Sequence, residues 1–254
     1  MLLRMLEQLM RRAGSPIAQT TLATESGMAN NTVALGYLEL LSDLLVLGTS
    51  EPWDPNRKVR VSRKASKYPF INLLATNTWW TKRYTTPAAL ETAPGEEKGV
   101  WWEWAVAAEL FRRAAKAGDP TPTLSRYWRS DAHEIDFVRT GKPWIEVKAG
   151  KTSPLEFGWF VKAFPREQLL VVNSERFQSD RVRGVTLEGF LLDETLWRRR
   201  SGVALRNASD DPKPRFKLVA GSALGRGRRP RVRFQGCRSQ RRGRARLRRR
   251  CCLW

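Results

Sequence analysis

The chain has 254 residues, a hydrophobic fraction of 41% and a formal net charge of +21. This length allows one large domain or two small ones, and the hydrophobic fraction is sufficient for a core. No apolar run reaches the ~18 residues that a membrane-spanning helix needs, and the N-terminus lacks the order of a secretory signal. We therefore expect a cytoplasmic protein with no membrane partner.

The charge is spread unevenly along the chain. Residues 221–254 contain 13 Arg and no Lys, Asp or Glu, whereas the first 220 residues contain 33 basic and 25 acidic residues. A basic surface favours phosphate-rich partners because neutralised phosphates release counterions, so we expect DNA as a partner. Residues 196–254 are predicted to be a basic, disordered tail. It is either a nucleic-acid-binding arm or the product of out-of-frame translation of GC-rich DNA.

Cysteine and histidine usage limits the kinds of site that the chain can build. Cys237, Cys251 and Cys252 all lie in the tail, and His133 is the single histidine. This excludes a disulfide framework, a cysteine zinc site and a histidine-rich metal site in the body of the protein. Any metal must be held by carboxylates, which are the ligands preferred by Mg²⁺ or Mn²⁺.

The sequence of residues 1–66 predicts a winged helix-turn-helix. Helices are expected over about 2–10 and 18–26, and a third from Asn30 or Asn31 to about residue 43, because apolar residues recur there at helical spacing. Residues 44–47 and 58–61 would form the two-stranded ribbon. The start of the third helix, Asn30, Asn31 and Thr32, is the candidate nucleic-acid contact. Docking of a protein partner is the stronger alternative, since residues 30–43 include no Lys or Arg.

Residues 67–97 are expected to connect this module to a second domain over residues 98–195. The pattern there predicts a helix over 98–116, strands over 124–128, 134–139 and 143–148, a helix over 155–163 and a buried strand over 168–172. An apolar stretch at 185–192 would close the domain. The fold class is therefore α+β or α/β, with a mixed sheet flanked by helices.

Three acids and a lysine suggest a metal-dependent nuclease site in this second domain. Asp136 lies in the second predicted strand, and Glu146 and Lys148 share one face of the third because side chains alternate along a strand. Two carboxylates on paired strands can chelate Mg²⁺, which polarises a phosphoryl oxygen and activates a water. Lys148 would orient that water or stabilise negative charge, and Glu103 on the preceding helix would add a metal ligand. The alternative is a solvated polar face of a half-buried sheet.

A distinctive combination of residues runs through both predicted domains: Ala23, Gly27, Thr32, Val33, Tyr37 and Leu38, then 99–103 (Gly-Val-Trp-Trp-Glu), 127–129 (Tyr-Trp-Arg), 134–137 (Glu-Ile-Asp-Phe) and 145–148 (Ile-Glu-Val-Lys). Taken together, residues 2–192 resemble the domain of unknown function at the C-terminus of bacterial and archaeal AAA-type ATPases. The resemblance implies a winged helix followed by a PD-(D/E)XK nuclease-like fold. It also implies that Glu103, Asp136, Glu146 and Lys148 occupy the nuclease-motif positions.

Full-length members of that group carry an ATPase domain ahead of this region. The present sequence contains no G-x-x-x-x-G-K-[ST] motif, so we expect no ATP hydrolysis by this polypeptide and interpret it as a truncated fragment. A separate ATPase domain or another protein is then an expected partner. Three functions remain open: a DNA-associated regulatory or nuclease-like module, an active Mg²⁺-dependent DNA endonuclease, and a non-enzymatic protein-interaction module.

Overall fold

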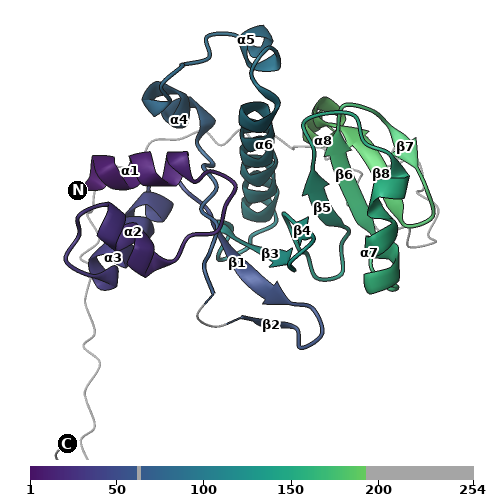
Figure 1. Cartoon of the computed structure of the whole chain (residues 1–254), viewed down its shortest axis with the longest axis horizontal. Helices are drawn as coiled ribbons and strands as arrows, with labels where there is room; N and C mark the ends of the chain where they lie inside the picture. The colour runs from purple at the N-terminus through teal and green to yellow at the C-terminus, as the bar shows by residue number, and fades with distance from the viewer. Residues whose placement is uncertain (62–63, 193–254) are drawn as a thin grey trace, which may run out of the picture. The chain divides into compact units, whose positions relative to one another are not determined.

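The computed structural model describes residues 1–61 and 64–192, so the expected basic tail lies outside the described residues (Figure 1). The described residues all belong to one unit, Met1–Val203. Its fold is α+β, with two mixed sheets flanked by helices. Among the described helices, none is long and apolar enough to cross a membrane.

Three N-terminal helices form where the sequence predicts them: α1 (Leu2–Arg11), α2 (Gln19–Glu25) and α3 (Asn31–Asp43). Gly27 follows α2 with a φ of 68°, a conformation that glycine adopts without steric cost. The side chain of Asn30 accepts a hydrogen bond from the Val33 N–H at 3.0 Å and so caps α3. Met5, Leu22 and Leu38 pack together in the core that these helices share.

The predicted strand at residues 44–47 is wrong. The Leu45 N–H bonds to the carbonyl of Ser42 at 2.9 Å, and the Val46 N–H bonds to that of Leu41 at 2.9 Å, so this apolar run closes α3 instead. A short apolar run without alternation does not distinguish a strand from the buried end of a helix. The two-stranded ribbon is instead formed by β1 (Thr49–Asp54), which begins just after this run, and β2 (Val59–Arg60); the two strands pair antiparallel.

Strand β1 also pairs with a strand that comes about 70 residues later in the chain. Its other edge runs parallel to β3 (Leu124–Arg129), which in turn pairs antiparallel with β4 (Glu134–Ile135). The resulting sheet has the order β2-β1-β3-β4. The expected boundaries near residues 66 and 98 stay a prediction, but strands from both sides of them share this sheet.

The second sheet consists of β5 (Trp144–Val147), β6 (Leu169–Asn173), β7 (Phe177–Gln178) and β8 (Val182–Thr186) in the order β5-β6-β8-β7. Strands β5, β6 and β8 are parallel, and all of β5 and β6 is buried, which is typical of parallel strands covered on both faces. The three strands expected over 124–148 in one mixed sheet are therefore divided between two sheets. An antiparallel bridge between Phe137 and Ile145 joins these sheets.

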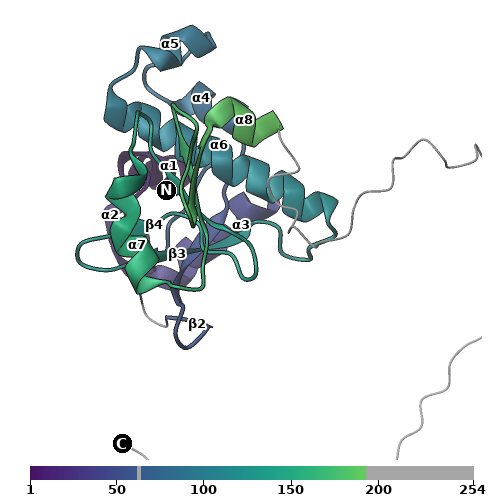
Figure 2. The ribbon, with the colours of Figure 1, turned by 90° about the vertical axis from the view of Figure 1, so that its right-hand side faces the viewer.

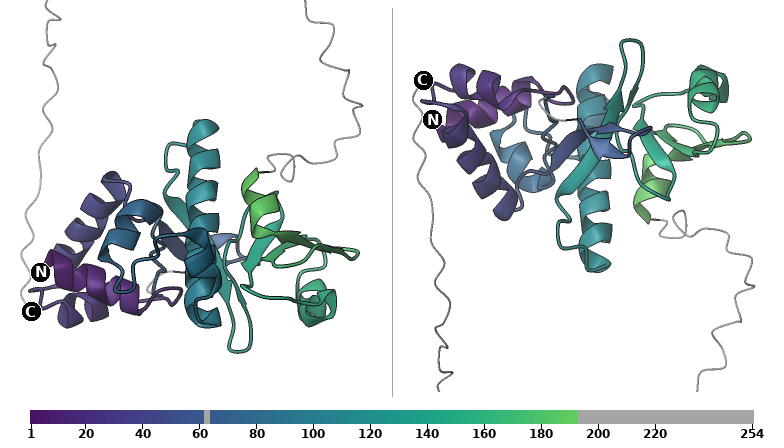
Figure 3. Two further views of the ribbon diagram at one scale, coloured as in Figure 1. Left: turned by 90° about the horizontal axis from the view of Figure 1, so that it is seen from above. Right: turned by 90° about the horizontal axis from the view of Figure 1, so that it is seen from below.

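Helices cover both faces of the second sheet (Figure 2). The long helix α6 (Gly95–Lys116) and α8 (Leu187–Leu192) pack on one face. On the other face lies α7 (Gly158–Ala163), preceded by a 3₁₀ turn over Pro154–Phe157. The helix predicted over 155–163 is therefore split in two. The N-terminal helices and β5–β8 lie on opposite sides of α6 (Figures 1 and 3).

Helix α6 is apolar on two faces, which explains its density of tryptophans. Trp101 and Trp104 join the core of the N-terminal helices, whereas Trp102 and Val106 pack against the second sheet. Residues 67–97, expected to be an irregular connection, include two short helices, α4 (Leu73–Trp79) and α5 (Pro87–Glu91). Trp80, directly after α4, stands edge-to-face on Trp104 with ring centroids 5.5 Å apart.

Candidate functional site

The candidate site begins where β4 ends. After Ile135 the chain bends at Asp136, and the Oδ2 atom of Asp136 accepts a hydrogen bond from the Val147 N–H of β5 at 2.9 Å. The carboxylate thereby takes the place of a backbone carbonyl in the ladder. The next residue, Phe137, returns to regular pairing and exchanges both backbone hydrogen bonds with Ile145, at 3.0 and 2.8 Å. Asp136 is held between the two sheets and is buried.

Glu146 and Lys148 share one side of β5, as their spacing predicts. Ile145 and Val147 join the apolar core beneath α6, and Glu146 faces the opposite way. The Lys148 ammonium lies 2.7 Å from Glu146 Oε1, while its side chain stays about half exposed. Glu146 is only 4% exposed, and its second oxygen, Oε2, has no hydrogen-bond partner in the described part of the chain.

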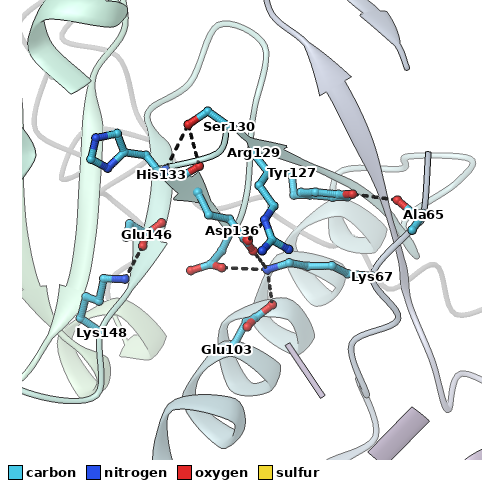
Figure 4. A network of polar contacts seen from close by, with 11 residues as sticks. Ala65, Lys67, Glu103, Tyr127, Arg129, Ser130, His133, Asp136, Glu146 and Lys148 are labelled. Atoms are coloured by element: carbon cyan, nitrogen blue, oxygen red, sulfur yellow. Dashed lines mark hydrogen bonds and ion pairs between the residues drawn. The ribbon is translucent and has the colours of Figure 1, made fainter. Parts of the chain in front are cut away.

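A residue that sequence reasoning missed, Lys67, lies at the centre of the site (Figure 4). Its ammonium is 3.0 Å from Asp136 Oδ1 and 3.3 Å from Glu103 Oε1, and it also pairs with Glu134. The Lys67 side chain is 3% exposed. The other oxygen of Glu134 lies 3.4 Å from the Arg129 guanidinium. Lys67 thus joins three carboxylates from α6, β4 and the bend after β4.

The electrostatics of the site are set by burial. Burial raises the pKa of Glu103 to about 8; the charge of Lys67 opposes this shift and that of Asp136 adds to it. Burial likewise raises the pKa of Glu146 to about 8, reinforced by Asp136 and opposed by Lys148. For Lys67, burial acts against the charged form, but the neighbouring carboxylates outweigh it and hold its pKa well above the usual value. Two of the acids therefore carry protons easily near neutral pH, while Lys67 remains a cation.

In this arrangement the carboxylates do not fit a divalent metal. Across residues 1–61 and 64–192, no group of three or more His, Cys, Asp or Glu side chains is placed to hold one. Asp136 directs one oxygen at Lys67 and the other at the Val147 N–H, and Glu146 is engaged by Lys148. The ammonium of Lys67 stands where the carboxylates converge. The expected Mg²⁺ or Mn²⁺ site stays a prediction.

The predicted nucleic-acid residues lie elsewhere in the fold. Asn30, Asn31 and Thr32 are exposed at the N-terminus of α3. The side-chain oxygen of Asn30 is used as the helix cap, so it is already committed to the Val33 N–H. Asn31 and Thr32 are accessible to a partner, and their role in binding stays a prediction.

His133, for which the sequence suggests no role, has a structural one. Its imidazole stacks on the Trp159 indole with ring centroids 4.0 Å apart and nearly parallel planes. Its backbone closes the β3–β4 turn, because the Ser130 N–H bonds to the His133 carbonyl at 2.8 Å. This turn brings Glu134 and Asp136 back toward α6.

Comparison with protein-family models, curated proteins and solved structures returned no match. The resemblance to the C-terminal domain of AAA-type ATPases thus rests on the residues quoted above.

Proposed function

We propose that this chain is a DNA-associated, nuclease-like regulatory module of the kind found at the C-terminus of AAA-type ATPases, combining a winged helix with a PD-(D/E)XK-like domain. The observation that carries the proposal is the gathering of Glu103, Asp136 and Glu146 at the junction of α6, β4 and β5, with Lys148 beside them. Buried acids with strongly shifted pKa values cluster at functional sites more often than elsewhere. No ATP hydrolysis is proposed for this chain.

The element order supports the same proposal. Helix α6 is followed by strands β3, β4 and β5, then by α7 and the parallel strand β6. This is the order expected from the sequence for a meander that feeds a crossover. The site lies where β4 of the first sheet meets β5 of the second, so acidic side chains from several elements can reach one point.

A regulatory rather than a catalytic role is favoured by Lys67. Its ammonium neutralises the oxygens of Glu103 and Asp136 that a nuclease would direct at a metal or at a phosphodiester. In this arrangement two basic groups of the site remain accessible, because the side chains of Lys148 and Arg129 are 48% and 57% exposed. We therefore propose that the module binds the DNA backbone through exposed basic side chains, and that cleavage by it is weak or absent.

Fluorescence anisotropy with a labelled DNA duplex tests this proposal on the full chain. We expect binding that weakens as salt rises, because phosphate contacts release counterions. Lys148→Glu should weaken binding, whereas the matched reversal Lys162→Glu on an exposed site of α7 should have a smaller effect. Binding that is unchanged by Lys148→Glu but lost when the arginines of residues 226–250 become glutamine would place the affinity in the tail and contradict the proposal.

An active endonuclease is the second candidate, and plasmid nicking separates it from the first. We expect little nicking in Mg²⁺ or Mn²⁺ by the wild-type chain. Robust nicking that disappears in Asp136→Asn would favour the active enzyme instead. A residual activity that survives Asp136→Asn would come from a contaminant.

A protein-interaction module is the third candidate, and α3 favours it. Val33, Leu40 and Leu44 recur on one side of this helix and are 37%, 45% and 61% exposed. The helix carries no basic side chain that would favour DNA. Two results together would support this candidate over the other two. The chain would not bind DNA at low salt, and the immobilised chain would retain a partner ATPase that Leu40→Glu no longer retains.

A further inference from the structure

The ammonium group of Lys67 is surrounded in the way that a metal ion would be. An ammonium has three N–H donors, and three carboxylates accept from Lys67: Glu103 and Asp136 at 3.3 and 3.0 Å, and Glu134 in closer contact. The three acids come from separate elements, and each directs one oxygen at the Lys67 ammonium. Figure 4 shows this arrangement for Glu103 and Asp136. Since the Lys67 side chain is almost fully buried, water contributes little to its solvation.

The backbone fixes this lysine in place. The Lys67 N–H bonds to the Ser50 carbonyl at 2.9 Å, and the Ser50 N–H bonds to the Lys67 carbonyl at 2.8 Å. The preceding residue, Ser66, accepts from the Ile17 N–H at 2.9 Å. Nearby, the Tyr127 hydroxyl donates to the Ala65 carbonyl at 2.7 Å. The cation is thus supplied by a segment that is tied to β1, to β3 and to the N-terminal helices.

We propose that Glu103, Glu134 and Asp136 form a cation site whose resident ion is the Lys67 ammonium, and that a divalent metal binds there only when this ammonium is removed. The inference does not rest on the proposed function, because it concerns only which cation the carboxylates hold. It also assigns a role to Glu134, which the sequence did not single out as a ligand.

The geometry favours larger divalent ions once the ammonium is gone. The oxygens of Glu103 and Asp136 lie 3.3 and 3.0 Å from the Lys67 nitrogen. Calcium binds oxygens at roughly 2.3–2.6 Å and tolerates irregular coordination, whereas magnesium requires about 2.0–2.1 Å and near-octahedral geometry. The carboxylates would have to move inward by less for Ca²⁺ than for Mg²⁺. We therefore expect Ca²⁺ to bind more readily than Mg²⁺.

Glu146 supplies a further buried carboxylate near the Lys67 ammonium. Glu146 Oε2 is buried and has no hydrogen-bond partner among the described residues. The negative charge of Asp136 acts on Glu146, so the two carboxylates lie within electrostatic reach of each other. In Figure 4 the Glu146 carboxylate, which pairs with the Lys148 ammonium, belongs to the same group of polar side chains as Asp136 and Lys67. The charge of Lys67 also acts on Glu146, so this carboxylate lies within electrostatic reach of an ion that replaces Lys67.

The test is Mn²⁺ and Ca²⁺ binding to the full chain by isothermal titration calorimetry. Wild type should show no binding that depends on these carboxylates. Lys67→Met keeps the length of the side chain but removes its charge, and it should bind Mn²⁺ at least about tenfold more tightly than wild type, with a matching rise in Tm when the metal is added. The double variant Lys67→Met/Glu134→Gln should lose this gain. Lys82→Met, which breaks the ion pair with Glu97 on the surface, is the control and should gain nothing.

Two results would overturn the inference. The first is Mn²⁺ binding to the wild-type chain that Glu134→Gln abolishes, since the site would then accept metal with Lys67 in place. The second is a folded Lys67→Met that binds no metal. If Lys67→Met does not fold, Lys67→Gln provides the same measurement. If neither folds even with metal present, the wild-type titration decides the question by itself: a carboxylate-dependent signal contradicts the inference and its absence supports it.

Discussion

The Asp136 carboxylate accepts the Val147 N–H at 2.9 Å with one oxygen and holds the Lys67 ammonium at 3.0 Å with the other. One side chain therefore completes the backbone ladder between β4 and β5 and also anchors the buried cation. This links the stability of the sheet junction to the charge of the site, and the two contributions can be separated by substitution.

Two substitutions of Asp136 should destabilise the protein to different extents, because they remove one or both of its interactions. Asp136→Asn can still accept from the Val147 N–H but no longer compensates Lys67, so we expect a loss of about 1–3 kcal/mol. Asp136→Ala removes both interactions and leaves a buried N–H without a partner, so we expect about 3–5 kcal/mol. Urea unfolding measures both values. The control is Asp180→Ala, whose side chain is 86% exposed; a loss there as large as that of Asp136→Asn would contradict the interpretation.

The stability of the protein should fall as pH rises from about 4.5 toward 8. The pKa values of Glu103 and Glu146 are raised from the model-compound value of 4.5 to about 8 in the folded protein, so between these limits the folded state binds more protons than the unfolded state. The stabilisation from each protonated acid is complete below pH 4.5 and is lost as pH passes through about 8. The slope is at most about 1.4 kcal/mol per pH unit for each group.

Urea unfolding at several pH values checks this dependence. Glu146→Gln cannot release a proton, so its stability should vary less over the same window than that of wild type. Glu7→Gln changes an exposed residue of α1 and should leave the dependence as it is. A wild-type stability that rises steadily across the window would show that Glu103 and Glu146 are ionised throughout it.

Much of the fold could be predicted from the sequence because its elements are strongly periodic. The helices α1, α3 and α6 and the strands β3, β5 and β6 form close to their expected positions. The prediction placed the first ribbon strand at residues 44–47 instead of at β1. Residues 49–54, Thr-Ser-Glu-Pro-Trp-Asp, include a proline and mostly residue types that are uncommon in strands. The parallel pairing of β1 with β3 depends on partners far along the chain, which no local pattern reveals.

The site was predictable in part for the same reason. Asp136, Glu146 and Lys148 belong to neighbouring strands, so their spacing and alternation indicate that they lie close together. Lys67 is separated from Glu103 by 36 positions and from Asp136 by 69, and it precedes an apolar segment without periodicity. The bridge between Lys67 and Ser50 of β1, together with the β1–β3 pairing, brings it to the acids. The one sequence signal for it is a lysine directly beside Tyr68 and Phe70, and this signal is weak.

Substitution by alanine should lower the stability of the protein more at Gly14 than at Gly118, which has the same backbone conformation. Gly14 has a φ of 76°, and a Cβ atom there would lie 3.2 Å from Glu103 Oε2. Gly118 has a φ of 77°, and a Cβ atom there would have nothing within 4 Å. Gly→Ala costs about 1 kcal/mol at either position from the backbone alone. The excess loss in Gly14→Ala, measured by thermal unfolding, reports the contact with Glu103, and equal losses would argue against it.

Gly184 should tolerate no side chain while Phe177 is present. The two residues are paired across β7 and β8, and a Cβ atom on Gly184 would lie 2.3 Å from the Phe177 ring, closer than real Cβ atoms approach. The ring carbons nearest to this Cβ atom include Phe177 Cγ, which joins the ring to the Cβ atom of Phe177. A small rotation of the ring therefore does not relieve the overlap. We expect Gly184→Ala to cost about 1–3 kcal/mol.

A double-mutant cycle isolates the Gly184–Phe177 contact. Phe177→Ala removes the ring, so Gly184→Ala in that background should cost clearly less than in wild type. Unfolding free energies of the four proteins give the coupling directly. If the two losses simply add, the overlap with the ring is not what excludes a side chain at Gly184, and the β7–β8 register at this pair would have to differ from the one described.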